Sequence, residues 1–434
     1  MTEQRLGILA GGGGLPREIA ESAAARGLPV SIVAIDGEAD ADFGAHKVTV
    51  VNWGQIGAML RALKQERVTD LVIVGRVHRP ELGRLKPDLG FFRYLPKILK
   101  IVAAGGDDSV LRRVVRFFED QGLTVIGPGD AAPALVVDEG PMGAEAASSA
   151  DRADIAKGLE LVRALGRFDI GQGVIVSNGR IEAIEGAEGT DRMLARAAKQ
   201  RRLAGQGVHG GVLVKRTKPG QDIRVDMPTI GPATVEGAHE AGLSGIAVEA
   251  GCVLVADRSL TLSRADTSHV FIEGVSDGAG QDAKPRFNAH KSTMAFRILT
   301  RETPDQHVTH DAMKAVATLD AVAPFAAGDA VVVVRNHVLS VEAGGEGAIA
   351  AIARAMELRQ WASLTRRRRG VAGLARDEDL TRTVIESVAK AGYAGVVLAG
   401  APRQGRADMK DLIRMADEQG IVILERASEA GATS

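Results

Sequence analysis

The residues that decide the fold of the N-terminal part read Leu-Gly-Ile-Leu-Ala-Gly-Gly-Gly-Gly-Leu-Pro, at positions 6–16. The apolar run 6–10 predicts a buried strand, and the glycines after it predict a tight turn. Pro16 suits the first turn of a helix, which we expect to end at Gly27. A second apolar run, 30–34, follows. This order of strand, glycine turn, helix and strand predicts a Rossmann-like α/β domain over residues 1–135.

The glycine turn is similar to the dinucleotide-binding fingerprint, except that Pro16 replaces the third glycine of Gly-x-Gly-x-x-Gly. Backbone N–H groups at a helix N-terminus can still hold a pyrophosphate. The alternative is a tight turn that binds nothing. Arg76 leaves the end of the apolar run 71–75, where open α/β sheets bind ligands. The candidate substrate-binding residues here are Gly11, Gly12, Gly13 and Arg76.

The composition narrows the class of protein. A chain of 434 residues suggests roughly two to four domains. The hydrophobic fraction of 45% is that of an ordinary soluble protein, and the net charge of −1 gives no reason to expect a nucleic-acid partner. One cysteine, Cys252, excludes an intrachain disulfide and fits a reducing cytoplasm. We find no signal peptide and no apolar run of membrane-spanning length, so a cytoplasmic protein is expected.

Residues 87–104 hold much of the aromatic content, with basic residues between the apolar ones. Pro96 is expected to kink or split any helix there. The segment fits core packing, and the alternative is a surface that holds acyl chains or rests on a bilayer. Gly-Gly-Asp-Asp at 105–108 then caps the next helix. Asp107 is a candidate substrate-binding residue, because two successive aspartates can leave one for a ligand.

Residues 215–231, Lys-Arg-Thr-Lys-Pro-Gly-Gln-Asp-Ile-Arg-Val-Asp-Met-Pro-Thr-Ile-Gly, form the densest charged stretch. We call residues 218–231 the Asp motif. Asp222, Arg224 and Asp226 would share one face of an extended strand. In a helix, the two aspartates would lie one turn apart. Carboxylates beside basic side chains suit Mg²⁺ next to phosphate, and the alternative is a surface loop with solvated ion pairs.

The Asp motif belongs to a second predicted α/β domain, residues 136–280. Asn178-Gly179 lies between two apolar runs and is a strong hairpin signal. Thr190 and Asp191 stand at the start of a predicted helix, where caps and anion sites both occur. Both are therefore candidate substrate-binding residues.

Taken together, these motifs resemble the LpxI family, the UDP-2,3-diacylglucosamine pyrophosphatases of lipid A biosynthesis. The resemblance covers about residues 5–275 and rests on the stretches 6–16, 86–90 (Lys-Pro-Asp-Leu-Gly), 105–108, 183–191 (Ala-Ile-Glu-Gly-Ala-Glu-Gly-Thr-Asp) and 218–231. It implies two α/β domains with the lipid-nucleotide between them. It also implies Mg²⁺-dependent hydrolysis to UMP and 2,3-diacylglucosamine 1-phosphate (lipid X).

The resemblance further implies that an aspartate of the Asp motif is essential. We favour Asp226, with Asp222 as its partner, as catalytic residues and as ligands of Mg²⁺ or Mn²⁺. Lys215, Lys218 and Arg224 would neutralise phosphate charge. The enzyme would be cytoplasmic and peripheral to the inner membrane, with a homodimer left open. The alternative is a nucleotide- or lipid-binding α/β protein without catalysis.

Residues 285–434 lie outside this resemblance and are interpreted as a degenerate internal repeat of the second domain. The predicted helix 311–324 matches that at 151–165, and Ala348 and Ile349 stand where Thr190 and Asp191 stand. Two further matches pair the stretch 395–398 with 211–214, and Arg406–Met409 with Arg224–Met227. Because the polar residues differ, we expect a non-catalytic copy.

Overall fold

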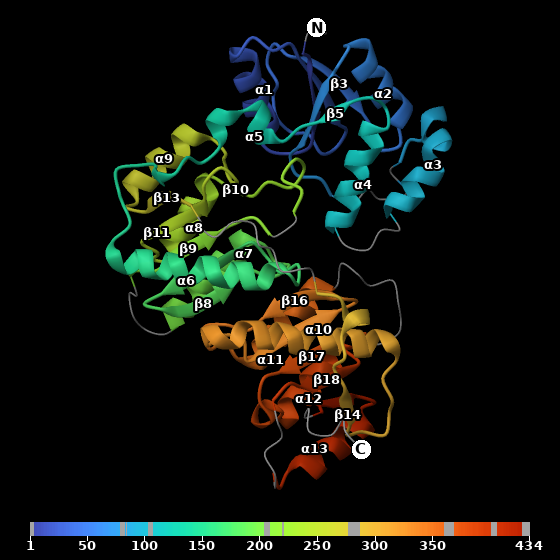
Figure 1. Ribbon diagram of the computed structural model, residues 1–434, viewed down its shortest axis with the longest axis vertical. Coiled ribbons are helices and arrows are strands. Elements are labelled where there is room, and N and C mark those ends of the chain that lie inside the picture. Colours follow the sequence, from blue (N-terminus) through green and yellow to red (C-terminus); the bar gives the residue numbers. More distant parts are fainter. Residues whose placement is uncertain are drawn as a thin grey trace.

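The computed structural model describes residues 4–78, 83, 85–102, 107–203, 209–218, 221–276, 287–359, 369–400 and 406–427, leaving aside the side chains of 100–102, 107–109 and 359. Three larger sheets follow one another along the chain and lie in a row, the central one between the other two (Figure 1). We name the N-terminal, central and C-terminal regions after them. Helices accompany each sheet, so the fold is α/β as predicted. Within the described ranges, no helix combines the length and the apolarity that crossing a membrane requires.

The N-terminal sheet is parallel throughout, in the strand order β3-β2-β1-β4-β5. Its elements are β1 (Leu6–Ala10), α1 (Leu15–Ala25), β2 (Val30–Ile35), β3 (Lys47–Val51), α2 (Ile56–Gln65), β4 (Asp70–Val74), α3 (Leu89–Val102), α4 (Asp107–Glu119), β5 (Thr124–Val125) and α5 (Pro128–Ala131). The order reverses between β1 and β4, as in a doubly wound Rossmann-like sheet. The glycine turn and Arg76 follow these two strands, so they lie at the switch point where such sheets bind ligands.

The stretch 86–90 has a structural role in this region. Asp88 accepts hydrogen bonds from the N–H groups of Gly57 (3.2 Å) and Ala58 (2.8 Å) at the start of α2, and from Phe91 (2.8 Å) in α3. A Cβ atom on Gly90 would lie 2.4 Å from the Cα of Gly57. The glycine pair therefore lets α2 and α3 touch, while one aspartate caps both.

Pro96 was expected to kink or split a helix in this segment, and it does not split it, because the single helix α3 runs through the proline. The carbonyl that loses a hydrogen bond to Pro96 belongs to Phe92, which is 59% exposed, so water can replace that bond. One face of α3 packs on α4, with the rings of Tyr94 and Phe117 5.3 Å apart. Leu89 and Leu99 join Phe92 on an exposed apolar face, at 90% and 58% exposure.

The central sheet is mixed, in the order β6-β13-β11-β9-β7-β8, with a separate two-stranded pair β10-β12. Its elements are β6 (Gly140–Pro141), α6 (Ser149–Gly166), β7 (Gly173–Ser177), β8 (Arg180–Ile184), α7 (Thr190–Leu203), β9 (Val212–Lys215), β10 (Thr229–Ile230), α8 (Pro232–Glu240), β11 (Gly245–Glu249), β12 (Leu254–Val255), α9 (Arg258–Thr267) and β13 (Phe271–Val275). The predicted hairpin joins β7 and β8, and both turn residues, Asn178 and Gly179, have positive φ.

The C-terminal sheet has the order β14-β19-β18-β17-β15-β16, which matches the central sheet strand for strand. Its elements are β14 (Phe296–Ile298), α10 (Gln306–Val322), β15 (Ala330–Val334), β16 (His337–Val341), α11 (Gly347–Arg359), β17 (Val371–Leu374), α12 (Arg382–Lys390), β18 (Gly395–Leu398), α13 (Met409–Glu418) and β19 (Val422–Arg426). Position by position, β15 corresponds to β7, β17 to β9, and β18 to β11.

The two sheets also share the way their hairpins are held. Asp154 on α6 is buried and accepts hydrogen bonds from both N–H groups of the turn Asn178-Gly179 (2.9 and 2.7 Å). Asp311 on α10 does the same for the turn Arg335-Asn336 (3.0 and 2.6 Å). A shared topology and a shared buried cap identify the C-terminal sheet as a structural repeat of the central one.

This topology corrects one sequence match. The stretch 395–398 was paired with 211–214, which lies in β9, but β18 occupies the place of β11. Arg406–Met409 therefore follows the counterpart of β11 and is not a copy of the Asp motif. Only residues 375–381 join β17 to α12, whereas residues 216–231 join β9 to α8, so the repeat lacks the whole motif loop. The error arose because short apolar strands are alike in sequence.

Candidate active site

A buried polar cluster lies at the edge of the central sheet where β8 and β9, which run in the same direction, both end. Lys215 is the last residue of β9 and is 5% exposed, and Glu185 follows β8 and is 9% exposed. The Nζ atom of Lys215 donates hydrogen bonds to Oγ1 of Thr190 (2.9 Å) and to the carbonyl oxygen of Thr229 (3.3 Å). Thr190 and Asp191 begin α7, so the sheet brings Lys215 to a helix N-terminus.

The charges of this cluster depend on one another. Burial lowers the pKa of Lys215, while the negative charges of Glu185 and Asp191 act in the opposite direction. Burial also raises the pKa of Glu185, and the charge of Lys215 opposes that shift. An ammonium group shielded from water interacts strongly with an anion, because solvent screens the attraction less. The cluster is therefore suited to an anionic group that reaches the start of α7.

The Asp motif adopts a turn of helical type between β9 and β10. The N–H groups of Val225 and Asp226 both donate to the carbonyl oxygen of Asp222 (3.1 Å each). The two aspartates therefore lie one turn apart, as in the helical alternative, and not along an extended strand. Gln221 holds Asp226, because its Nε2 donates to the carbonyl oxygen (2.7 Å) and to Oδ2 (2.5 Å) of that aspartate.

Asp222 and Arg224 form a two-pronged ion pair. Oδ1 and Oδ2 of Asp222 accept hydrogen bonds from Nε (2.8 Å) and Nη2 (2.7 Å) of Arg224. Hydrogen bonds from Arg224 hold the pKa of the Asp222 carboxyl below its usual range, and the same contacts raise the pKa of Arg224. Asp222 is thus engaged by a neighbouring cation, and Asp226 by the amide of Gln221.

The Asp motif also contacts the N-terminal region. Nη1 of Arg224 lies 3.0 Å from Oε1 of Glu119 on α4, and Val225 packs against the apolar core of the N-terminal sheet. A Cβ atom on Gly129 in α5 would lie 3.5 Å from Cε of Met227. On the other side of the motif, Nζ of Lys218 lies 2.9 Å from Oδ1 of Asp169 in the central region. The motif therefore bridges the N-terminal and central regions.

The three glycine amides at the switch point already have acceptors within the protein. Gly11 and Gly12 donate to carbonyl oxygens at and just after the end of β4 (2.8 and 2.7 Å). Gly13 donates to Oδ1 of Asp40 (2.6 Å), an exposed hydrogen bond to a carboxylate. Of these amides, that of Gly13 is the one a phosphate oxygen could most readily take over, by displacing Asp40. The side chain of Arg76 is exposed at the same edge.

One predicted substrate-binding residue lies outside the described side chains. Asp107 begins α4, but its side chain is not described, so its role stays a prediction.

The predicted Mg²⁺ or Mn²⁺ ion has no ready-made cluster of ligands among the described residues. Within the described part of the chain, no three His, Cys, Asp or Glu side chains gather at a possible metal site. Glu185 and Gln221 were not among the residues predicted for the site. Both lie in motifs quoted above: Glu185 directly follows an apolar run, and Gln221 directly precedes Asp222. These positions could have indicated them.

Comparisons with known proteins bear on the N-terminal and central regions, which the Asp motif bridges. A family model described as the LpxI N-terminal domain matches residues 5–135, and one described as the LpxI C-terminal domain matches residues 138–273 and 297–424. The chain belongs to the LpxI family. The C-terminal LpxI model thus matches the residues of the central sheet and also those of its structural repeat.

One relative within the LpxI family carries a functional name. The UDP-2,3-diacylglucosamine pyrophosphatase LpxI of Caulobacter vibrioides is 37% identical over 281 residues, which is 63% of this chain and 98% of the relative. Because the match takes in nearly all of the relative, that protein is too short to hold all three regions. The C-terminal region is therefore an addition to what that relative contains.

Proposed function

We propose that the chain hydrolyses the pyrophosphate bond of UDP-2,3-diacylglucosamine to UMP and 2,3-diacylglucosamine 1-phosphate (lipid X) in lipid A biosynthesis. The observation that carries this proposal is the Asp motif, which bridges two α/β regions next to the strand that ends in buried Lys215. A binding protein needs cations for phosphate and gains nothing from carboxylates beside them, whereas hydrolysis needs both. The 37% identity to a pyrophosphatase supports the same activity.

Each part of the site has a role in this proposal. Lys215 and Thr190 bind phosphate oxygens at the start of α7, where the helix N-terminus adds positive potential. Asp226 orients the attacking water, and Gln221 fixes the direction of its carboxylate. Arg224 is placed to stabilise the charge that develops on the leaving phosphate, in competition with Asp222.

A magnesium ion, or manganese in its place, belongs to the same proposal. Mg²⁺ is commonly held by one or two carboxylates and completes its shell with substrate phosphates and water. This mode of coordination fits the Asp motif, which contains Asp226 and Asp222 but has no third carboxylate or imidazole grouped with them among the described residues. When bound, such an ion polarises phosphoryl oxygens and lowers the pKa of a bound water.

We expect hydrolysis to stop after chelation with EDTA and to recover on addition of Mg²⁺ or Mn²⁺. Zn²⁺ should restore less activity, because the Asp motif contains no cysteine or histidine. The measurement is UMP release by the purified protein before and after dialysis against the chelator. Undiminished UMP release in EDTA would contradict a metal-dependent reaction.

The test of the function itself is UMP release from UDP-2,3-diacylglucosamine. UDP-N-acetylglucosamine is the control substrate, because it lacks the two acyl chains of the lipid. We expect UMP and lipid X in equal amounts from the first substrate and little turnover of the second. Tight binding of the lipid without UMP release would instead support the non-catalytic alternative, a nucleotide- or lipid-binding protein.

The lipid substrate leads us to propose that the protein is cytoplasmic and peripheral to the inner membrane, which it contacts through the exposed face of α3. Leu89, Phe92 and Leu99 are 90%, 59% and 58% exposed on that face. Apolar side chains with basic neighbours on a surface helix suit the boundary of an anionic bilayer. The proposal concerns contact with the membrane surface and no spanning segment.

Changing Phe92 and Leu99 to serine together is expected to weaken binding to vesicles of anionic lipid about thirtyfold, because each exposed side chain would contribute about 1 kcal/mol when buried. Co-sedimentation with the vesicles measures the effect. Leu203→Ser is the matched control, since Leu203 is 78% exposed at the far end of α7. Equal binding by the double variant and the control would exclude α3 as the contact surface.

A further inference from the structure

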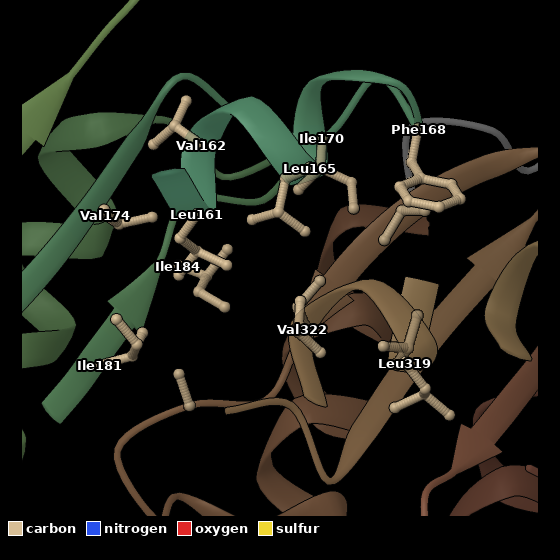
Figure 2. Close-up of a cluster of buried hydrophobic side chains, with 14 of the residues drawn as sticks. Leu161, Val162, Leu165, Phe168, Ile170, Val174, Ile181, Ile184, Leu319 and Val322 are labelled. Atoms are coloured by element: carbon tan, nitrogen blue, oxygen red, sulfur yellow. The ribbon is translucent and has the colours of Figure 1, made fainter. Parts of the chain in front are cut away.

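One continuous cluster of buried apolar side chains joins the central and C-terminal regions. Figure 2 shows side chains of α6, β7 and β8 on one side of this cluster and side chains of α10 on the other. Val162 and Leu165 on α6 hold the same helical positions as Leu319 and Val322 on α10, and all four are at most 3% exposed. The same face of the repeated unit is therefore used on both sides of the contact.

The charged contacts at this boundary are reciprocal. Oε1 of Glu188 lies 2.9 Å from Nη2 of Arg196 in its own region and 3.4 Å from Nη1 of Arg354 across the boundary. Glu346 pairs with Arg354 in its own region, and its Oε2 lies 3.9 Å from Nη1 of Arg196 across the boundary. The four side chains are between 3% and 14% exposed. Such mutual pairing is what a two-fold axis between two copies produces.

The backbone contacts across the boundary are reciprocal as well. The N–H of Ala187 donates to the carbonyl oxygen of Leu339 in β16 (3.2 Å), and a Cβ atom on Gly186 would lie 2.6 Å from that oxygen. In the other direction, a Cβ atom on Gly344 would lie 2.3 Å from the carbonyl oxygen of Glu182 in β8. In each region, the loop that follows the β-hairpin thus packs against the second hairpin strand of the other region. The close approach there leaves room only for glycine.

The loop held in this way leads directly into the candidate active site. It runs from Glu185, a member of the buried polar cluster, to Thr190 and Asp191 at the start of α7. The corresponding positions of the C-terminal region hold Ala348 and Ile349, and Leu374 ends β17 where Lys215 ends β9. The C-terminal region therefore has the contact surface of the repeated unit without its polar cluster.

We propose that the C-terminal region is a built-in partner for the central region. It covers the face on which a second copy of the central region would otherwise pair, so the full chain is a monomer with one active site. The homodimer left open by the sequence is replaced by pairing within one chain. Through Arg354, a positioning residue, the C-terminal region also holds the loop 185–189 in place, and this last role rests on the proposed function.

The first test is the mass of the full-length protein by sedimentation equilibrium at micromolar concentration. We expect a single species of 45.4 kDa. A stable dimer would overturn the proposal, whether it formed by exchange of C-terminal regions between chains or through another surface, because pairing would then not be completed within one chain.

The second test is hydrogen–deuterium exchange in the full-length Arg354→Gln variant. Loss of the guanidinium should speed exchange in residues 186–195 about tenfold and leave the N-terminal sheet unchanged. Arg426→Gln is the matched control, because Arg426 pairs with Asp320 (2.9 Å) within the same region. If Arg354→Gln does not fold, Arg354→Lys serves in its place, since it keeps the charge but not the fork that reaches Glu188 and Glu346.

Unchanged exchange in the loop would overturn the positioning role, and this readout does not depend on any activity. If UMP release is confirmed for the wild type, Arg354→Gln should also lower kcat severalfold with little change in KM. If the wild type releases no UMP, the proposed hydrolysis fails, while the mass and the exchange rates still decide the inference.

Discussion

Replacing Asp226 by alanine is expected to leave a folded protein that still binds the UDP-lipid but releases almost no UMP. The fold should persist because Asp226 is half-buried and its N–H remains bonded to the carbonyl oxygen of Asp222. Turnover should fall by about a hundredfold to a thousandfold or more, the usual effect of losing a group that acts in the transition state. Steady-state UMP release and equilibrium binding of the lipid, measured on the same preparation, separate the two effects.

Asp408→Ala is the matched control for this substitution. Asp408 also follows an arginine, with Oδ1 2.7 Å from Nε of Arg406, but it is exposed and belongs to the C-terminal region. Its loss should change the free energy of activation by no more than about 0.5 kcal/mol. Near-normal turnover in Asp226→Ala would remove that residue from the reaction. A collapse of turnover in folded Asp408→Ala would show that the C-terminal region takes part.

Gln221→Ala offers an intermediate test of the same account. It keeps the Asp226 carboxylate but removes the amide that donates to Oδ2, so the direction of the carboxylate is fixed less firmly. The expected loss of turnover lies between those of the wild type and Asp226→Ala. Addition of more Mg²⁺ should recover part of it if Asp226 acts as a metal ligand, because excess metal offsets a weaker site.

The parts of the fold that could be predicted from the sequence are those with local signals. The glycine turn before Pro16 and the turn Asn178-Gly179 each demand a particular backbone conformation, and the structure has β1, α1 and the β7–β8 hairpin at these places. The hydrogen bond between Lys215 and Thr190 was not predicted, although both were named as candidate residues and Thr190 was placed at the start of a predicted helix.

The parts that could not be predicted depend on contacts between distant residues. Nothing near Arg224 in the sequence reveals that Glu119 lies 3.0 Å away, or that Asp222 takes both of its oxygens to the same guanidinium. In the C-terminal sheet, β17 and not β18 takes the position that β9 has in the central sheet. Hydrogen bonds between strands determine this order, and an apolar run in the sequence does not reveal it. The match of Arg406–Met409 to the Asp motif failed for that reason.

The buried cluster yields the second large effect, in Lys215→Met. Methionine fills a similar volume, but the variant leaves Glu185 buried without its cation. The pKa of the Glu185 carboxyl, already raised by burial, rises further when the opposing charge of Lys215 is gone. A carboxyl whose pKa is raised by folding contributes stability below its unfolded value and loses it as the pH rises through the folded value. The variant should therefore be about 3–5 kcal/mol less stable than the wild type at pH about 8, and much closer to it at pH about 5.

Urea denaturation of both proteins at the two pH values measures this difference, with the denaturant slope as a check that the unfolded state has not changed. The double variant Lys215→Met with Glu185→Gln separates stability from activity. Its neutral amide needs no counter-charge, so most of the lost stability should return at pH about 8 and the dependence on pH should largely vanish. UMP release should stay low in both variants, because the cation that binds the phosphate is missing from each. An equal loss of stability at both pH values would mean that Glu185 and Lys215 do not depend on each other for charge, and the electrostatic account of the cluster would have to be abandoned.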